Sequence, residues 1–262
     1  NIGLVMKLLI VILKEIAETL IRNWRLLFVK SKFTEVVSTI RNKGVAIKPN
    51  FLSEETCEKY IDIIDKAIAD EKVNTWVDDA GADHRVYFIN ELSDELNEFY
   101  TDPYIRQVLA EYTGIKDPKG MLLAGRIDAV EGNVGSGGGW HRDSPVHHQT
   151  KAICYLSDVT GKNGPFQYIP SSNSKASVVG AYLKGIFSPG QYRFSEEEIK
   201  NYCSESGQEI VDMTAEAGTL LFADTKGLHR GKPIKNGRRY VLFCYFWDKK
   251  IPDHFEQLRQ VK

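Results

Sequence analysis

The second half of the chain constrains the fold most, because short β-rich runs alternate there with turns. Glycine- or proline-containing segments separate the runs. This punctuation is typical of antiparallel strands in a sandwich or barrel. The predicted strands lie at residues 121–130, 152–157, 166–169, 177–179, 218–223 and 240–247. We therefore expect a β sandwich or a β barrel in this half.

The first third of the chain is predicted to be mainly helical. Ser53 precedes Glu55 and Thr56, which predicts a capped helix running to about residue 71. A short strand is expected at 45–47, and a further helical stretch at 93–112. Apolar residues recur at helical spacing in both helical stretches.

One segment interrupts the β-rich half. Residues 182–206 are polar and aromatic, and we expect an inserted, lid-like loop there with a short helix at 195–202. The chain shows no internal repeat. The expected organisation is a helical extension at 1–40, followed by one catalytic domain at 41–262.

Composition excludes some classes of protein. The 262 residues are 42% hydrophobic, enough for one sizeable core. A net charge of -1 gives no electrostatic basis for binding nucleic acid. The four cysteines are scattered and form no CxxC pair. Reduced thiols in a cytoplasmic protein are therefore expected, and not a disulfide framework.

The N-terminal segment allows two interpretations. Residues 2–13 are almost wholly apolar, but a bilayer span needs about 20 apolar residues, and a signal-peptide cleavage pattern is missing. Residues 16–33 mix apolar and basic side chains, which predicts an amphipathic helix with basic edges. Such helices pack on their own domain or on a partner subunit (self-association). Alternatively, they attach at the periphery of an anionic membrane.

Three residues have the chemistry of a metal site. His141 and Asp143 lie two positions apart, so an extended backbone points both side chains the same way. His229 follows a predicted strand further along the chain. Two imidazoles and one carboxylate on one face of a metal are the donor set suited to iron(II) in oxygenases. Zinc hydrolases can use the same ligands, so the triad alone leaves both chemistries open.

Arginines provide a second signal. Arg238 and Arg239 stand at the start of an apolar strand, where a guanidinium can form a bidentate pair with a carboxylate inside a barrel. Strand alternation allows only one of them to point inward. A metal beside an inward arginine suits a chelating keto-acid with a distal carboxylate. Arg126 and Asp128, which share one face of an earlier strand, are further candidates for co-substrate or substrate contact; the alternatives are a structural ion pair or a solvated face.

These motifs resemble those of a known family, the phytanoyl-CoA dioxygenase-like branch of the iron(II)/2-oxoglutarate oxygenases. The segments that carry the resemblance are WHRD at 140–143, NGPFQYIPS at 163–171, GTLLFAD at 218–224 and LHRG at 228–231, with Arg239. The match covers roughly 121–247. The resemblance implies a mainly β fold, a double-stranded β-helix (a cupin-like jelly roll), with N-terminal helices packed on the larger sheet.

The resemblance also implies the chemistry. Non-haem iron(II) would sit on His141, Asp143 and His229, and 2-oxoglutarate would bind Arg239, which the family's spacing favours over Arg238. Oxygen would be the second co-substrate. The expected reaction is hydroxylation of a small molecule with release of succinate and CO2. The carboxylate at 143 argues against halogenation, because related halogenases have a small residue there.

The sequence departs from the family at two places. Many members carry a serine or threonine two residues after the distal histidine, where it helps to bind the co-substrate carboxylate; this chain has Gly231. Arg239 therefore needs a different partner. A histidine common in the family is replaced by Asn173.

Other outcomes remain open. Desaturation, epimerisation and ring closure use the same metal site. A non-redox, metal-dependent jelly-roll enzyme (a hydrolase or an isomerase) and a catalytically silent binding protein are the competing classes. Candidate substrate contacts are His147, His148 and Lys232, with residues 83–87 as a polar wall of the entrance. We expect a small-molecule substrate and no nucleic-acid partner.

Overall fold

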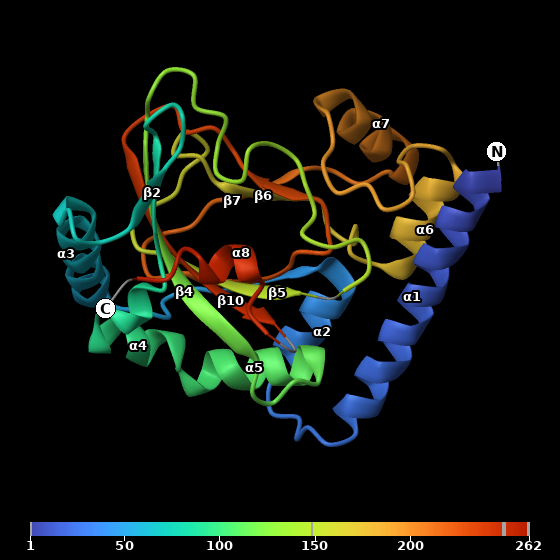
Figure 1. The fold of residues 1–262 in the computed structure, drawn as a ribbon, viewed down its shortest axis with the longest axis horizontal. Helices are drawn as coiled ribbons and strands as arrows, with labels where there is room; N and C mark the ends of the chain where they lie inside the picture. Colours follow the sequence, from blue (N-terminus) through green and yellow to red (C-terminus); the bar gives the residue numbers. More distant parts are fainter. Residues whose placement is uncertain (1, 148, 248–249, 261–262) are drawn as a thin grey trace.

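Two antiparallel sheets form the core of the computed structural model, which describes residues 2–147, 149–247 and 250–260 (Figure 1). The larger sheet has the order β1-β8-β5-β10-β4-β3-β2, and the smaller has the order β7-β6-β9. The strands of the larger sheet are β1 (Val45–Lys48), β2 (Thr75–Val77), β3 (Asp83–Tyr87), β4 (Lys119–Asp128), β5 (Thr150–Tyr155), β8 (Leu220–Asp224) and β10 (Arg238–Trp247). Those of the smaller sheet are β6 (Phe166–Tyr168), β7 (Val211–Met213) and β9 (His229–Gly231).

Strand β10 lies in the middle of the larger sheet, paired with β4 along its whole length and with β5. Its side chains alternate between the two faces, as the period of a strand requires. Leu242 and Cys244 pack into the core beneath the helices. Val241 and Phe243 face the space between the sheets. The two facing antiparallel sheets form the predicted double-stranded β-helix.

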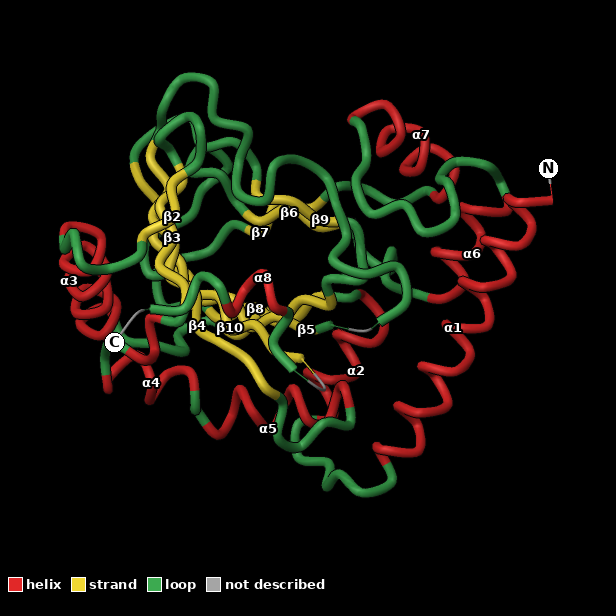
Figure 2. Tube along the Cα trace, viewed as in Figure 1, coloured by secondary structure: helices red, strands yellow, loops and turns green. Residues whose placement is uncertain are grey.

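Helices cover the outer face of the larger sheet, as expected (Figures 1 and 2). They are α2 (Thr34–Lys43), α3 (Glu54–Ala69), α4 (Asp94–Tyr100) and α5 (Pro103–Thr113). The predicted cap of α3 is confirmed, because the Thr56 amide donates to the Ser53 hydroxyl at 3.2 Å. The stretch expected as one helix at 93–112 is two helices. Pro103 begins the second one and Asp102 caps it.

The prediction of a strand at 177–179 is wrong. Those residues lie inside α6 (Lys175–Leu183), whose first turn is capped by Ser174 accepting from the Ser177 amide. The cap outweighs the β preference of the adjacent valines. The expected helix at 195–202 is present as α7 (Glu196–Ser206), with a capping box made by Ser195 and Glu198. A 3-10 turn (Ile89–Glu91) and α8 (Asp253–Glu256) complete the elements described, and all four cysteines are free.

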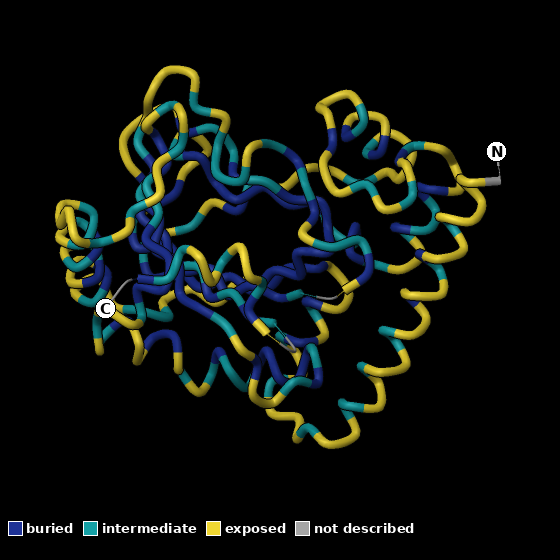
Figure 3. The backbone as a smooth tube through the Cα atoms, in the orientation of Figure 1, coloured by how far each residue is buried: buried dark blue, intermediate teal, exposed yellow. Residues whose placement is uncertain are grey.

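Residues 2–26 form a single helix, α1 (Ile2–Leu26), where the sequence suggested two segments. It leans along the side of the molecule and contacts α5 and α6 (Figure 1). Glu15 of α1 forms an ion pair with Lys226, and both side chains are almost fully buried. Most of the remaining surface of α1 is exposed (Figure 3). Among the described helices, none combines the length and apolarity that a bilayer span requires.

The alternation along β10 gives a stability prediction. Leu242 is fully buried in the centre of the sheet, so Leu242→Ala leaves a cavity. We expect it to lower the free energy of unfolding by about 2–5 kcal/mol in urea denaturation. Leu183→Ala, at a side chain that is 68% exposed, is the matched control and is expected to change it by less than about 0.5 kcal/mol. Equal losses in the two variants would contradict the burial pattern.

Candidate metal centre

The site begins with a backbone contact between two histidines that are distant in sequence. The His141 amide donates to the His229 carbonyl at 2.9 Å, and the His229 amide donates back to the His141 carbonyl at 2.9 Å. This antiparallel bridge places the two imidazoles side by side, with ring centroids 4.3 Å apart. His141 and His229, the first residue of β9, thus direct their imidazole rings to the same place.

The third residue of the triad completes the cluster. Asp143 Oδ1 lies 3.7 Å from His141 Nε2 and 3.9 Å from His229 Nε2. All three candidate ligand atoms lie within 4.8 Å of one another. The Nδ1 of each histidine is 2.9 Å from a backbone carbonyl, that of Gly139 or Gly227. An Nδ1–H that donates to a carbonyl leaves the Nε2 lone pair free for a metal.

The electrostatics also suit a metal. Burial lowers the pKa of His229 to about 3 and lowers the pKa of His141 as well. Burial opposes ionisation of Asp143, but Lys151 and the two histidines hold the pKa of that carboxyl well below its ordinary value. At neutral pH the site therefore offers two neutral imidazoles and one carboxylate, the protonation states that metal binding needs.

Lys151 is a site residue that the sequence analysis missed. It lies on β5, with Nζ 2.5 Å from Asp143 Oδ2 and 4.3 Å from the centroid of the Tyr245 ring. Burial disfavours its charge, but Asp143 raises the pKa of Lys151 overall. The ion pair fixes one carboxylate oxygen and leaves Oδ1 facing the histidines. The available signal was a lysine within an otherwise mostly apolar strand.

A pocket leads from the histidines to Arg239 and is lined by residues of both sheets. The Arg239 side chain is 2% exposed, and in the described part of the chain it forms neither an ion pair nor a side-chain hydrogen bond. Burial lowers its pKa. An unpaired guanidinium is costly to bury, so its environment fits a ligand that brings a carboxylate.

Ser136 supplies a hydroxyl next to Gly231, the position where many family members carry a serine or threonine. A Cβ placed on Gly231 would lie 2.7 Å from the Cβ of Ser136, so the glycine admits this serine to the pocket. The Ser136 hydroxyl accepts a hydrogen bond at 2.9 Å from Arg85, which is paired with Asp83 at 2.6 Å. Ser136 was missed in the sequence because it stands alone in a glycine-rich turn.

Asn173 also has a clear role. Its side-chain amide donates to Asp224 Oδ2 at 3.0 Å, next to the Tyr112 hydroxyl, which donates to the same oxygen at 2.5 Å. All three side chains are buried. Asn173 therefore ties the loop after β6 to the end of β8, close to the turn that leads to His229.

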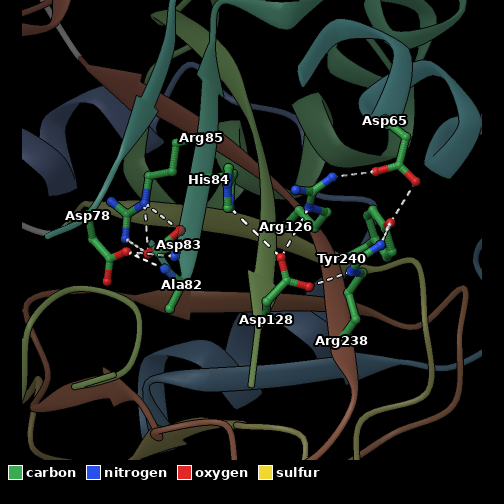
Figure 4. A network of polar contacts seen from close by, with 10 residues as sticks. All are labelled: Asp65, Asp78, Ala82, Asp83, His84, Arg85, Arg126, Asp128, Arg238 and Tyr240. Carbon is green, nitrogen blue, oxygen red and sulfur yellow. Dashed lines mark hydrogen bonds and ion pairs between the residues drawn. The ribbon is translucent and has the colours of Figure 1, made fainter. Parts of the chain in front are cut away.

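Arg126 and Arg238 lie on the other face of the sheet, and the structure does not bring them to the pocket (Figure 4). Arg238 pairs with Asp128, and Arg126 pairs with Asp65 of α3 at 3.1 Å and with Asp128 at 3.3 Å. Their even positions direct them toward the helices, whereas Arg239 points inward. The expectation of a single inward arginine is met, while Arg126 and Asp128 have a structural ion pair in place of a ligand contact.

The segment expected as a lid pairs with the metal motif. The Arg142 amide donates to the Tyr192 carbonyl at 2.9 Å, and the Phe194 amide donates to the Trp140 carbonyl at 3.0 Å. The Arg142 side chain turns away from the metal ligands and lies fully buried, with its guanidinium 5.4 Å from the Phe194 ring centroid. Arg142 therefore anchors residues 184–195 beside the site.

The remaining sequence candidates are dispersed. Arg85 lines the pocket, but His84 is on the outer face, with Nδ1 3.9 Å from Asp128 (Figure 4). Lys232 pairs with Asp212 at 2.7 Å. His147 Nδ1 lies 2.8 Å from Glu18 of α1. His148 falls outside the described residues.

A second, larger cavity of about 320 Å³ adjoins the metal site. Asp143 and His147 contribute to one wall, and Glu18, Arg22 and Arg25 of α1 contribute to another. The Nε of Arg22 is buried without a hydrogen-bond partner among the described residues. The metal site is thus flanked by an inner pocket ending at Arg239 and an outer cavity beside α1.

The ligand geometry predicts the effect of removing one imidazole. We expect His229→Ala to weaken Fe(II) or Ni(II) binding at least about a hundredfold, which exceeds the usual cost of losing an outer-shell partner. Equilibrium dialysis with metal analysis measures the change. His254→Ala, at an exposed histidine of α8, is the control that should bind metal as the wild type does. Tight binding by the His229 variant would rule out this centre.

Comparisons with known proteins agree with this site. The sequence profile of phytanoyl-CoA dioxygenase (PhyH) matches residues 40–240. A search of curated proteins found no match. Among solved structures, the carbocyclase SnoK from nogalamycin biosynthesis aligns with a TM-score of 0.63 at 16% identity, covering 88% of this chain and 92% of that one.

Two further structures share the fold. EctD from S. alaskensis with bound Fe gives a TM-score of 0.59 at 15% identity, with 83% and 80% coverage. HygX from Streptomyces hygroscopicus, with nickel, 2-oxoglutarate and hygromycin B bound, gives 0.58 at 13% identity, with 83% and 88% coverage. The profile match spans most of the chain and contains all three candidate ligands. The chain therefore belongs to the phytanoyl-CoA dioxygenase family, and its site is that of an iron- and 2-oxoglutarate-dependent enzyme.

Proposed function

We propose that the protein hydroxylates a small molecule, using iron(II), 2-oxoglutarate and oxygen, and releases succinate and CO2. One observation carries the proposal: a cluster of two neutral histidines and one carboxylate adjoins a pocket that also holds a buried arginine with no ion-pair partner among the described residues. Bound iron and 2-oxoglutarate supply the oxidising chemistry, and the protein supplies position and a dry environment.

The chain's own residues have distinct tasks in this proposal. His141, Asp143 and His229 would hold the metal beside the pocket that reaches Arg239. Arg239 binds the distal carboxylate of 2-oxoglutarate, and the Ser136 hydroxyl lines the same pocket. Lys151 is a positioning residue, because it orients the Asp143 carboxylate through Oδ2.

The competing reactions make other demands on the protein. A non-redox hydrolase or isomerase has no use for a buried arginine that lacks a partner, and a silent binding protein has no need of an intact triad. Epimerisation requires a hydrogen donor placed on the opposite face of the substrate carbon. Hydroxylation needs no protein acid or base beyond the metal ligands, so it is the outcome that we propose.

The outer cavity is the proposed substrate site. It reaches Asp143, and Glu18, Arg22 and Arg25 of α1 are among its lining residues. Glu18 is already paired with His147. The buried Nε of Arg22, which has no hydrogen-bond partner among the described residues, favours a substrate with a carboxylate, sulfate or phosphate group.

The first test needs no substrate. Enzymes of this kind turn over 2-oxoglutarate slowly on their own, so the iron(II)-loaded protein should form succinate when oxygen is admitted, and His229→Ala should form none. Arg239→Met should raise the KM for 2-oxoglutarate by roughly tenfold or more, because a buried ion pair with the co-substrate is lost. Arg238→Met changes the adjacent, outward arginine and should leave the KM unchanged.

Two results would contradict the proposed function. The first is a protein that binds iron but forms no succinate and shows no weak visible charge-transfer band with 2-oxoglutarate under anaerobic conditions. The second is equal KM values for the Arg239 and Arg238 variants.

The substrate class is tested with a panel of small molecules sorted by charge. We expect anionic members to raise succinate formation above the basal rate, with the product analysed for an added oxygen. Arg22→Gln should raise the KM for such a molecule by roughly tenfold, because one charged contact is lost. Lys162→Gln, at an exposed cation between β5 and β6, should not change it. Stimulation by neutral molecules alone would reject an anionic substrate.

A further inference from the structure

One side of α1, which we call its outer face, is apolar along the whole helix. It includes Met6, Leu9, Leu13, Ile16, Leu20 and Trp24. These side chains are between 44% and 65% exposed. They recur every three or four residues, so they form one continuous stripe. Exposed Leu27 and Phe28 extend it just beyond the end of the helix.

The polar face of α1 is turned toward the protein. Glu15 is buried in its ion pair with Lys226, Glu18 pairs with His147, and the Arg22 guanidinium lies 5.9 Å from the Tyr112 ring centroid. An amphipathic surface helix ordinarily buries its apolar face and exposes its polar one. In α1 the inward face carries these polar groups together with buried Val11, whereas the stripe is exposed and nothing in the described part of the chain covers it. An apolar surface of this extent indicates a binding partner.

The charges around the stripe indicate which partner. Both acidic residues of α1 face inward, whereas Lys7 and Lys14 are exposed beside the stripe. Lys30 and Lys32 are exposed just after the helix. The outward side therefore combines apolar and cationic groups without a carboxylate. A second copy of the chain would bring more lysines and no counter-charge, whereas anionic lipid headgroups complement both features.

The geometry sets the orientation. A helix of 25 residues is about 37 Å long, and the stripe follows its axis from end to end. The buried Glu15–Lys226 pair holds the opposite face on the protein, so the helix lies along a surface and does not cross it. Trp24 and Phe28 pack edge to face at 5.3 Å, and such aromatic residues favour the headgroup level of a bilayer.

We propose that the outer face of α1 docks the protein onto an anionic lipid bilayer, with the helix axis in the membrane plane. This docking is independent of the reaction at the metal site. The apolar side chains enter the boundary between headgroups and acyl chains, and the lysines contact the headgroups.

Vesicle sedimentation with the full chain tests the docking. The wild type should bind mixed vesicles of phosphatidylcholine and phosphatidylglycerol. It should bind vesicles of phosphatidylcholine alone more weakly. The double variant Leu13→Glu/Leu20→Glu should lower the partition coefficient at least about a hundredfold, because two inserted side chains become charged. Lys7→Gln/Lys14→Gln should lower it roughly tenfold on the anionic vesicles only. Leu92→Glu, a 46% exposed position away from α1, should bind as the wild type does.

Each variant is checked for its melting temperature and metal content, which substitutions at exposed positions should preserve. Failure of the folded wild type to bind anionic vesicles overturns the proposal, and so does undiminished binding by Leu13→Glu/Leu20→Glu. Light scattering identifies the alternative. A dimer that the same double variant splits into monomers, without vesicle binding, would assign the stripe to a second copy of the chain.

Discussion

The reciprocal backbone pairing of His141 and His229 is the contact on which the site depends. It joins the segment before β5 to the first residue of β9, and it places both imidazoles side by side. A shift of one residue in this pairing would turn one ring to the other face. Asp143 follows two residues later, and the carbonyls of Gly139 and Gly227 orient the rings. The hydrogen-bonded backbone thus determines both the position and the tautomer of the ligands.

Because side chains alternate between the two faces of the larger sheet, the residues that face the pocket are separated from those that pack under the helices. Inward positions on β5 and β10 carry Lys151 and Arg239, which face the pocket, while outward positions carry Arg238 and the apolar residues under the helices. The outward charges neutralise one another through Asp128 and Asp65. Charged groups therefore lie on both faces, but only the inward face buries one, Arg239, that has no ion-pair partner among the described residues.

Sequence patterns predicted those features that interactions between residues close in sequence determine. The triad, the cap at Ser53 and most strands of the larger sheet followed from spacing, and the resemblance added the jelly roll and Arg239. The strand at 177–179 failed because a single serine cap decided the local structure. Lys151 and Ser136 were missed because their roles arise only when strands and turns far apart in sequence meet. Arg126 was a candidate for ligand contact because the sequence shows that it shares a face of the strand with Asp128. The sequence does not show whether that face is turned to the pocket or to the helices.

The buried pair of Glu15 and Lys226 has a practical consequence for how the enzyme can be divided. The family match begins at residue 40, which suggests that a shorter chain would keep the catalytic unit intact. Such a chain would lack Glu15, and Lys226 would lose its carboxylate partner on the turn that leads directly to His229. Removal of one partner of a buried ion pair is destabilising. The first helix thus supplies a counter-ion to the turn that leads to His229, although it lies outside the region of the family match.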